Sequence, residues 1–136
     1  MKLLKKYLSM KSKYRIIKQD CIKWMNAQSP KSVDCIITSP PYNLNVKYGG
    51  YDDSAPRKVY LVWLGEIAKA IKKVLKDKGQ LFLNMGYSNS DPFVAMDVAK
   101  VFRKYYVLQN KFTWVKHIVV NDFGHGQYKP ITSNRY

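Results

Sequence analysis

The sequence predicts an α/β fold with a mostly parallel sheet flanked by helices. Two observations predict it. Segments with the composition of strands alternate along the chain with amphipathic segments, and the clearest strand segments are short apolar runs of the kind found inside parallel sheets. The chain has 136 residues, of which 46% are hydrophobic. This length and composition suit one domain with a hydrophobic core and exclude a disordered or collagen-like chain.

The first third of the chain is predicted to contain two strands and a short helix. Residues 14–18 (YRIIK) have the composition of a short strand. Asp20 can cap a short helix over residues 21–25. Residues 33–38 (VDCIIT) are mostly apolar and β-branched, which predicts a strand buried on both faces, with Cys35 as an inert core thiol.

A long helix and a second buried strand follow a long loop. A periodic apolar stripe predicts a helix over residues 56–76, with Gly79 as its stop signal. Residues 80–85 (QLFLNM) are predicted to form the strand. Ser90 or Asp91 can cap the next helix, whose apolar positions run from Val94 to Tyr105 at helical spacing. Residues 107–116 alternate like a strand, which residues 118–120 can extend.

The loop over residues 39–56 is the expected location of a functional site. It is rich in Pro, Gly, Asn and Asp, and a loop of this length inside a compact domain is usually functional. It also leaves the carboxyl end of a predicted parallel strand, and ligands bind outside that end in such sheets. The fold prediction therefore points to residues 39–51 without the help of any motif.

Charge and composition limit the kinds of partner and the location that we expect for this chain. Lys and Arg number 24 against 9 Asp and Glu, a net charge of +15, which points either to a polyanion or to a solvated lysine-rich surface. No apolar run approaches the ~18 residues of a membrane span, and the basic leader over residues 1–13 lacks the apolar core of a signal peptide. We therefore expect a cytoplasmic protein with no membrane partner. Two cysteines and two histidines without ligand spacing predict no metal site.

A short motif identifies the chemistry. The run Thr38-Ser39-Pro40-Pro41-Tyr42 follows a predicted strand and opens the long loop. It resembles the hallmark [Asp/Asn/Ser]-Pro-Pro-[Tyr/Phe/Trp] of the S-adenosylmethionine-dependent methyltransferases that modify exocyclic amines of DNA bases. The resemblance continues over residues 19–21, where Gln19 replaces the usual Gly, and over residues 81–86, 114–116 and 128–131.

The resemblance implies that Ser39, Pro40, Pro41 and Tyr42 are the catalytic residues. An exocyclic amine is a poor nucleophile because its lone pair is conjugated into the ring. The Ser39 hydroxyl and the Pro40 carbonyl can accept hydrogen bonds from its two N–H groups, hold the protons out of plane and free the lone pair, while the prolines fix the backbone. Tyr42 offers a flat face to a base flipped out of double-stranded DNA, and one such contact is worth about 1–3 kcal/mol.

The resemblance implies roles for further residues, and several of these residues also have a simpler structural explanation. Asp20 is implied to bind the adenine amine of S-adenosylmethionine, and it can cap a helix at the same time. Thr38 is implied to line the same cofactor site. Lys47 and Tyr48 can contact DNA or be solvated loop residues, and Lys116 and Lys129 can contact phosphates.

The glycine-rich cofactor loop of such enzymes is not found in the expected place. Residues 1–37 contain no Gly. In the circularly permuted beta class the catalytic segment comes first, so residues 14–136 resemble the N-terminal catalytic part of an incomplete methyltransferase domain. We expect a partial Rossmann-like fold that lacks the glycine-loop strand and its neighbour. Binding of S-adenosylmethionine by this chain alone is then doubtful, and a complementing chain, or self-association through an open sheet edge, is expected.

The sequence leaves two classes of function open. Ser39 at the first motif position favours cytosine N4 methylation over adenine N6 methylation. The alternative is a non-catalytic nucleic-acid-binding remnant or subunit that needs a partner chain.

Overall fold

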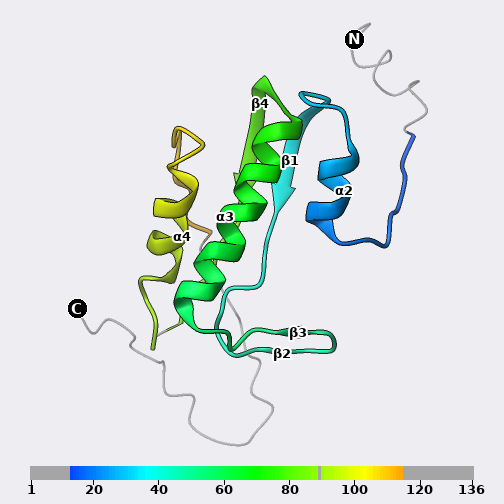
Figure 1. Cartoon of the computed structure of the whole chain (residues 1–136). Helices are drawn as coiled ribbons and strands as arrows, with labels where there is room; N and C mark the ends of the chain where they lie inside the picture. Colours follow the sequence, from blue (N-terminus) through cyan, green and yellow to red (C-terminus); the bar gives the residue numbers. More distant parts are fainter. Residues whose placement is uncertain (1–12, 89, 115–136) are drawn as a thin grey trace, which may run out of the picture.

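The computed structural model describes residues 13–88 and 90–114 (Figure 1). In chain order the elements are α2 (Cys21–Ala27), β1 (Val33–Thr38), β2 (Lys47–Tyr48), β3 (Tyr51–Asp52), α3 (Arg57–Val74), β4 (Leu75–Leu83) and α4 (Val94–Phe102). Strands β1 and β4 pair in parallel, and β2 and β3 form a small antiparallel hairpin. The α/β class is confirmed: this is a partial Rossmann-like fold with a parallel pair of strands flanked by helices.

Helix α3 organises the core. It lies along the β1–β4 pair, between α2 and α4 (Figure 1). Its apolar face includes Leu64, Ala68 and Val74, none of which has exposed surface. The core continues onto α4 through Val94 and Val98, which are also fully buried. The predicted amphipathic helices are therefore confirmed, because their apolar stripes meet in one cluster.

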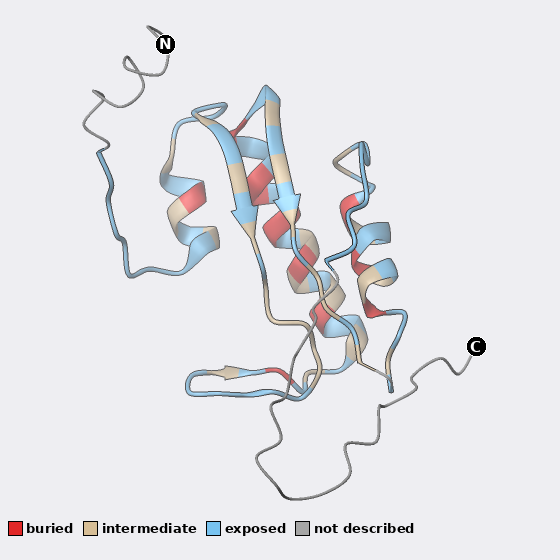
Figure 2. Ribbon diagram, turned by 180° about the vertical axis from the view of Figure 1, so that it is seen from behind, coloured by how far each residue is buried: buried red, intermediate tan, exposed pale blue. Residues whose placement is uncertain are grey.

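The register of the β1–β4 pair sorts its residues between two faces. Ile36 pairs with Leu81, and both pack against the core cluster. The next pair, Ile37 with Phe82, points the other way because side chains alternate along a strand. Ile37 is 78% exposed and Phe82 is 44% exposed. Figure 2 shows this second face, which no helix covers in the described part of the chain.

The prediction that residues 33–38 are buried on both faces is therefore wrong. Only one face of β1 meets α3, and Cys35, predicted as a core thiol, is exposed. We call the face that carries Cys35, Ile37 and Phe82 the bare face of the sheet. An apolar run indicates that a strand can be buried, but the covering layer decides whether it is.

The predicted strand over residues 14–18 is also wrong. The segment has no regular structure, and Tyr14 and Ile16 are 88% and 91% exposed. A strand needs the hydrogen bonds of a neighbour, and within the described ranges β1 pairs with β4 alone. Residues 107–114 likewise form no strand, and the rest of that prediction, residues 115–120, lies outside the described residues.

Two helix boundaries and the long loop differ from prediction. Helix α3 runs directly into β4, so Gly79 lies inside the strand, at a register shift where an added Cβ would lie 3.0 Å from the Asp34 carbonyl oxygen. Helix α4 begins after Phe93 without a side-chain cap, so the predicted cap by Ser90 or Asp91 is wrong; the Ser90 hydroxyl contacts that of Ser88, and Asp91 forms an ion pair with Arg57. The long loop is not structureless, since it contains the β2–β3 hairpin.

No helix in residues 13–88 and 90–114 is long and apolar enough to cross a membrane. The same residues contain no cluster of three or more potential metal ligands.

Candidate active site

The carboxyl ends of β1 and β4 bring two polar side chains together. Ser39 directly follows β1, and Asn84 directly follows β4. The backbone N–H of Asn84 donates to the Thr38 carbonyl oxygen at 2.9 Å, which extends the strand pairing by one hydrogen bond. Two residues 45 positions apart in the sequence are thus neighbours because the strands are parallel and in register.

Ser39, Tyr42 and Asn84 form a connected polar cluster. The Ser39 hydroxyl lies 2.7 Å from the Tyr42 hydroxyl, and either can be the donor. The Asn84 amide nitrogen donates to the Tyr42 hydroxyl at 3.0 Å and lies 3.4 Å from Ser39 Oγ. When the Ser39 hydroxyl donates its hydrogen bond to Tyr42, Ser39 Oγ keeps a lone pair beside the long Asn84 contact and can accept a hydrogen bond from a ligand amine. The cluster can therefore act as a hydrogen-bond acceptor at the end of the sheet.

Gly86 provides the space for the Tyr42 ring. A Cβ added at Gly86 would lie 2.6 Å from both Cδ2 and Cε2 of Tyr42, so the ring packs directly on the glycine backbone. A side chain at this position would displace the ring. Tyr42 is only partly buried, which leaves ring surface available to a flat ligand.

Tyr60 anchors the Pro-Pro turn from helix α3. Its hydroxyl donates to the Pro41 carbonyl oxygen at 2.7 Å, and its side chain is 1% exposed. Its ring lies 6.1 Å from that of Trp63, which in turn lies 5.5 Å from Tyr51 of β3. Burial raises the pKa of Tyr60 well above its ordinary value, so the phenol keeps the proton that it donates to Pro41. The motif is thus fixed to the helix core as well as to the sheet.

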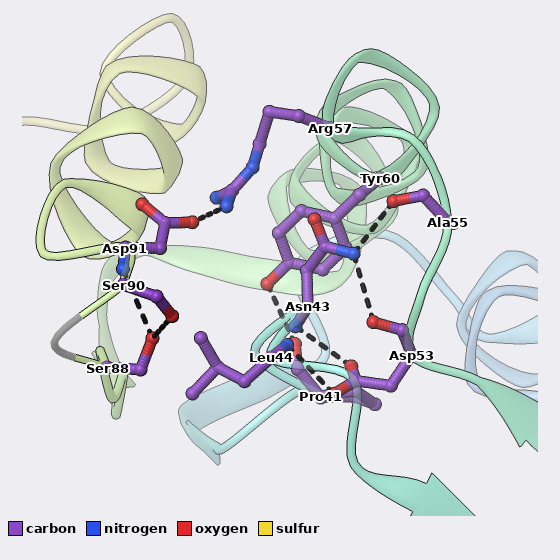
Figure 3. Close-up of polar contacts among 10 residues, drawn as sticks. All are labelled: Pro41, Asn43, Leu44, Asp53, Ala55, Arg57, Tyr60, Ser88, Ser90 and Asp91. Atoms are coloured by element: carbon purple, nitrogen blue, oxygen red, sulfur yellow. Dashed lines mark hydrogen bonds and ion pairs between the residues drawn. The ribbon is translucent and has the colours of Figure 1, made fainter.

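Asp53 holds the loop that follows the motif (Figure 3). Its side chain is 2% exposed, and its carboxylate accepts hydrogen bonds from the backbone N–H groups of Asn43, Leu44 and Val46. The Asn43 side chain donates to the carbonyl oxygens of Asp53 and Ala55. An open polar depression of about 370 Å³ lies beside this loop and is also lined by Ser88, Ser90 and Asp91.

The two predicted cofactor residues, Thr38 and Asp20, belong to different elements: Thr38 is the last residue of β1, and Asp20 precedes α2. Thr38 ends β1, and its carbonyl takes part in the bond to Asn84. Asp20 caps α2, as predicted, by accepting from the Lys23 N–H at 2.8 Å. The first turn of α2 lies toward the carboxyl end of β1 (Figure 1). Asp20 is exposed, and a carboxylate has capacity for more than one hydrogen bond.

The predicted DNA contacts fall on the hairpin or outside the described residues. Lys47 and Tyr48 form β2, and both are exposed. The Tyr48 ring meets that of Tyr51 edge-on at 6.3 Å. Lys116 and Lys129 lie outside the described residues, so the structure does not place them.

Sequence reasoning missed four residues of this site. Asn84 and Gly86 were treated as part of a strand motif, although a polar residue at the carboxyl end of a parallel strand is itself a signal. Tyr60 was predicted only as part of a helix, and Asp53 only as part of a loop. For these two no sequence signal was available, because their partners lie 19 and 7–10 residues away across irregular backbone.

Comparison with known proteins finds similarity over the same region. A family model described as DNA methylase, of the N6/N4 type, matches residues 33–134. The type II methyltransferase M.MjaVI of Methanocaldococcus jannaschii is 40% identical over 63 residues, which are 46% of this chain and 32% of that protein. M.HpaI of Haemophilus parainfluenzae is 38% identical over 72 residues, 53% of this chain and 23% of that protein. M.BglII of Bacillus subtilis is 33% identical over 90 residues, 62% of this chain and 24% of that protein. The aligned part is thus less than a third of each of these relatives.

We predict that Tyr60→Phe weakens the alkaline pH dependence of stability. The folded state holds the Tyr60 proton to a higher pH than the unfolded chain, so stability is fully present below the unfolded tyrosine pKa of about 10 and is lost as the pH rises above it. The variant should lose this part of the slope, and at neutral pH should be about 1 kcal/mol less stable because the Pro41 carbonyl loses its donor.

The measurement is urea unfolding at several pH values between about 7 and 11. Tyr87→Phe, at a side chain that is 68% exposed, is the matched control. Burial also raises the pKa of Tyr106, so a residual slope remains in the Tyr60 variant. Equal slopes for Tyr60→Phe and Tyr87→Phe would contradict the prediction.

Proposed function

The chain belongs to the N6/N4 family of DNA methylases, and on that premise we propose that it is the catalytic segment of a DNA amino-methyltransferase. The segment acts in the transfer of a methyl group from S-adenosylmethionine to an exocyclic amine of a DNA base. The observation that carries the proposal is the polar cluster of Ser39, Tyr42 and Asn84 at the carboxyl end of the sheet.

Each residue of the motif and the polar cluster has its own proposed role. Ser39 Oγ and the Pro40 carbonyl accept hydrogen bonds from the two N–H groups of the amine, which holds the amine out of conjugation and exposes its lone pair. The Tyr42 ring, backed by Gly86, stacks on the flipped base. Such a contact, worth about 1–3 kcal/mol, offsets much of the few kcal/mol that flipping costs. Asn84 holds the two hydroxyls in place.

S-adenosylmethionine fits the donor set at this end of the sheet. Asp20 presents an exposed carboxylate, which suits an adenine amine, and Thr38 ends the strand beside the motif. When bound, the cofactor supplies a methyl group already activated as a sulfonium. The protein then contributes mainly by positioning the amine, which is how a reaction with an activated donor gains most of its rate.

We assign cytosine N4 as the preferred target and adenine N6 as the alternative. Ser39 stands where the adenine enzymes more often have Asp or Asn. Nucleoside analysis of methylated DNA separates the two, because N4-methylcytosine and N6-methyladenine are distinct products.

DNA is the proposed partner, and the β2–β3 hairpin is the proposed contact within the described residues. Lys47 and Tyr48 are exposed on β2, close in sequence to the motif. Lys116 and Lys129 are proposed as further phosphate contacts. The net charge of +15 supports a polyanionic partner.

A second candidate is a subunit that works only with a complementing chain, and the bare face favours it. Ile37 and Phe82 pair side by side there with 78% and 44% of their surface exposed. An exposed apolar face favours burial against another polypeptide, and within the described residues β1 and β4 each also have one unpaired edge. The two candidates are compatible, since a catalytic segment can depend on a partner for its cofactor.

We predict that Ser39→Ala reduces methyl transfer at least about a hundredfold in the completed enzyme, since it removes a hydrogen-bonding group that contacts the amine, and that Tyr42→Ala reduces it about tenfold or more, since it removes the ring that stacks on the base. Tyr42→Phe keeps the ring but loses the hydroxyl, and should fall between wild type and Tyr42→Ala. Incorporation of tritiated methyl groups into DNA is the measurement, and Tyr87→Ala, at an exposed tyrosine, is the control. Near-normal turnover by Ser39→Ala would rule out its acceptor role.

DNA affinity should depend steeply on salt. If about four phosphates are contacted, raising the salt from about 50 to 200 mM weakens binding about a hundredfold. Lys47→Ala should lower the salt slope by about one contact, whereas Lys69→Ala on α3 should not. Fluorescence anisotropy with a labelled duplex measures both, and a flat salt profile would mean that the charge does not mark a DNA surface.

The chain by itself should associate and bind S-adenosylmethionine weakly. Light scattering should show a species larger than a monomer, and calorimetry should show no affinity tighter than about millimolar. Ile37→Asp on the bare face should reduce association, whereas Val59→Asp, at a similarly exposed site on α3, should not. A stable monomer that binds the cofactor with micromolar affinity would refute the need for a partner.

A further inference from the structure

We propose that Asp53 is a positioning residue, whose buried carboxylate fixes the turn between Tyr42 and the β2–β3 hairpin. Through this turn the hairpin and the Pro-Pro-Tyr segment form one rigid unit. The significance of this unit for catalysis rests on the proposed function, but its geometry stands independently of it.

The carboxylate gathers three backbone donors from one short turn. Asp53 Oδ1 accepts from the Asn43 N–H at 2.8 Å, and Oδ2 accepts from the Leu44 and Val46 N–H groups at 3.0 Å each. Successive N–H groups converge in this way only when the backbone alternates between conformations, and Asn43 and Asn45 have φ angles of 58° and 60°. Asparagine tolerates this left-handed region better than most residues. The turn is an anion-binding concavity, and the chain supplies the anion itself.

The same residues close the base of the hairpin. Asp53 directly follows β3, and Val46 directly precedes β2. The Asn43 side chain donates to the Asp53 carbonyl oxygen at 3.1 Å and to that of Ala55 at 2.8 Å (Figure 3). The Asn45 N–H donates to the Asp53 carbonyl oxygen at 3.3 Å. The two ends of the hairpin are thus tied together through the backbone and the side chain of Asp53.

The turn is directly connected to the polar cluster, since Asn43 follows Tyr42 in the chain. Tyr42 is held at its ring by Gly86 and at its hydroxyl by Ser39 and Asn84. The backbone on its carboxyl side is held by Asp53. A release of the turn would therefore let both Tyr42 and the hairpin residues Lys47 and Tyr48 change position.

An uncharged substitute cannot replace the carboxylate. In Asp53→Asn one of the two oxygens becomes an NH₂ group, which is a donor facing backbone donors. Whichever way the amide is turned, at least one N–H group loses its acceptor. Hydrogen bonds to charged groups are stronger than those between neutral groups, so this loss should loosen the turn.

Amide hydrogen exchange measured by NMR on the full chain tests the geometry. In Asp53→Asn, exchange at Asn43, Leu44 and Val46 should accelerate at least about tenfold, with amides inside α3 unchanged. The matched control is Asp52→Asn, which removes the same charge one residue away, where the carboxylate accepts hydrogen bonds from Ser54 alone among the described residues. Unchanged exchange at the three amides in Asp53→Asn, or equal acceleration in both variants, would overturn the proposal.

A second variant, Asn43→Gly, provides a test for the case that Asp53→Asn unfolds the whole chain. Asn43→Gly keeps the left-handed backbone and the Asp53 carboxylate but removes the side-chain bonds to Asp53 and Ala55. It should accelerate exchange at Leu44 and Val46 by a smaller factor, with α3 still protected. If the α3 amides of Asp53→Asn also lose protection, the result for Asn43→Gly decides, and unchanged exchange there would overturn the proposal.

Turnover of the completed enzyme tests the connection to catalysis. Asp53→Asn should lower kcat at least about tenfold with a smaller change in KM for DNA, whereas Asp77→Asn, which removes the same charge near the start of β4 and away from the polar cluster, should keep wild-type kcat. Equal kcat for the two variants would show that the turn does not position the site. If the wild-type enzyme transfers no methyl group, the proposed function fails, while the exchange data still decide whether Asp53 holds the turn.

Discussion

The parallel pairing of β1 with β4 is the constraint on which the rest of the site depends. Parallel strands end at the same edge of a sheet, so the residues that leave them are neighbours whatever their distance in the sequence. Here the pairing brings the Asn84 side-chain nitrogen within 3.4 Å of Ser39 Oγ. The hydrogen bond from the Asn84 backbone N–H to the Thr38 carbonyl oxygen continues the strand ladder up to the motif. Helix α3 makes the parallel arrangement possible, because it returns the chain to the start of the sheet while its apolar face fills the core.

The loop that follows β1 is held by polar groups that are themselves buried. Tyr60, 1% exposed, donates to the Pro41 carbonyl, and Asp53, 2% exposed, accepts from the turn after Tyr42. A buried polar group left without a partner destabilises a protein by about 1–3 kcal/mol, so both side chains favour the one loop conformation that satisfies them. The loop therefore gains its shape from specific hydrogen bonds, although it has little regular structure. A site that acts mainly by positioning requires this kind of support.

Local sequence information was sufficient for the helices, the parallel pair and the motif. Asp20 caps α2 because an Asn or Asp side chain at that position reaches its own helix, and the apolar stripe of α3 is visible in the sequence. Non-local facts were not accessible. Residues 14–18 have strand composition but no strand to pair with in the described part, and an apolar run in β1 does not reveal that one face is bare. Asp52 and Asp53 are adjacent and identical in type, yet one is exposed and the other buried beneath three N–H groups.

The bare face and the polar cluster are continuous, which connects the two halves of the proposed function. Side chains alternate along a strand, so Ser39 follows Ile37 on the same side of β1, and Asn84 follows Phe82 on the same side of β4. A polypeptide that covered Ile37 and Phe82 would therefore also border Ser39 and Asn84. Its arrival would exclude water from that side of the cluster, and hydrogen bonds of the Ser39 hydroxyl to an amine are stronger where water is excluded. Burial of the apolar face and assembly of a competent site are then one event, because the same strand register places both on one surface.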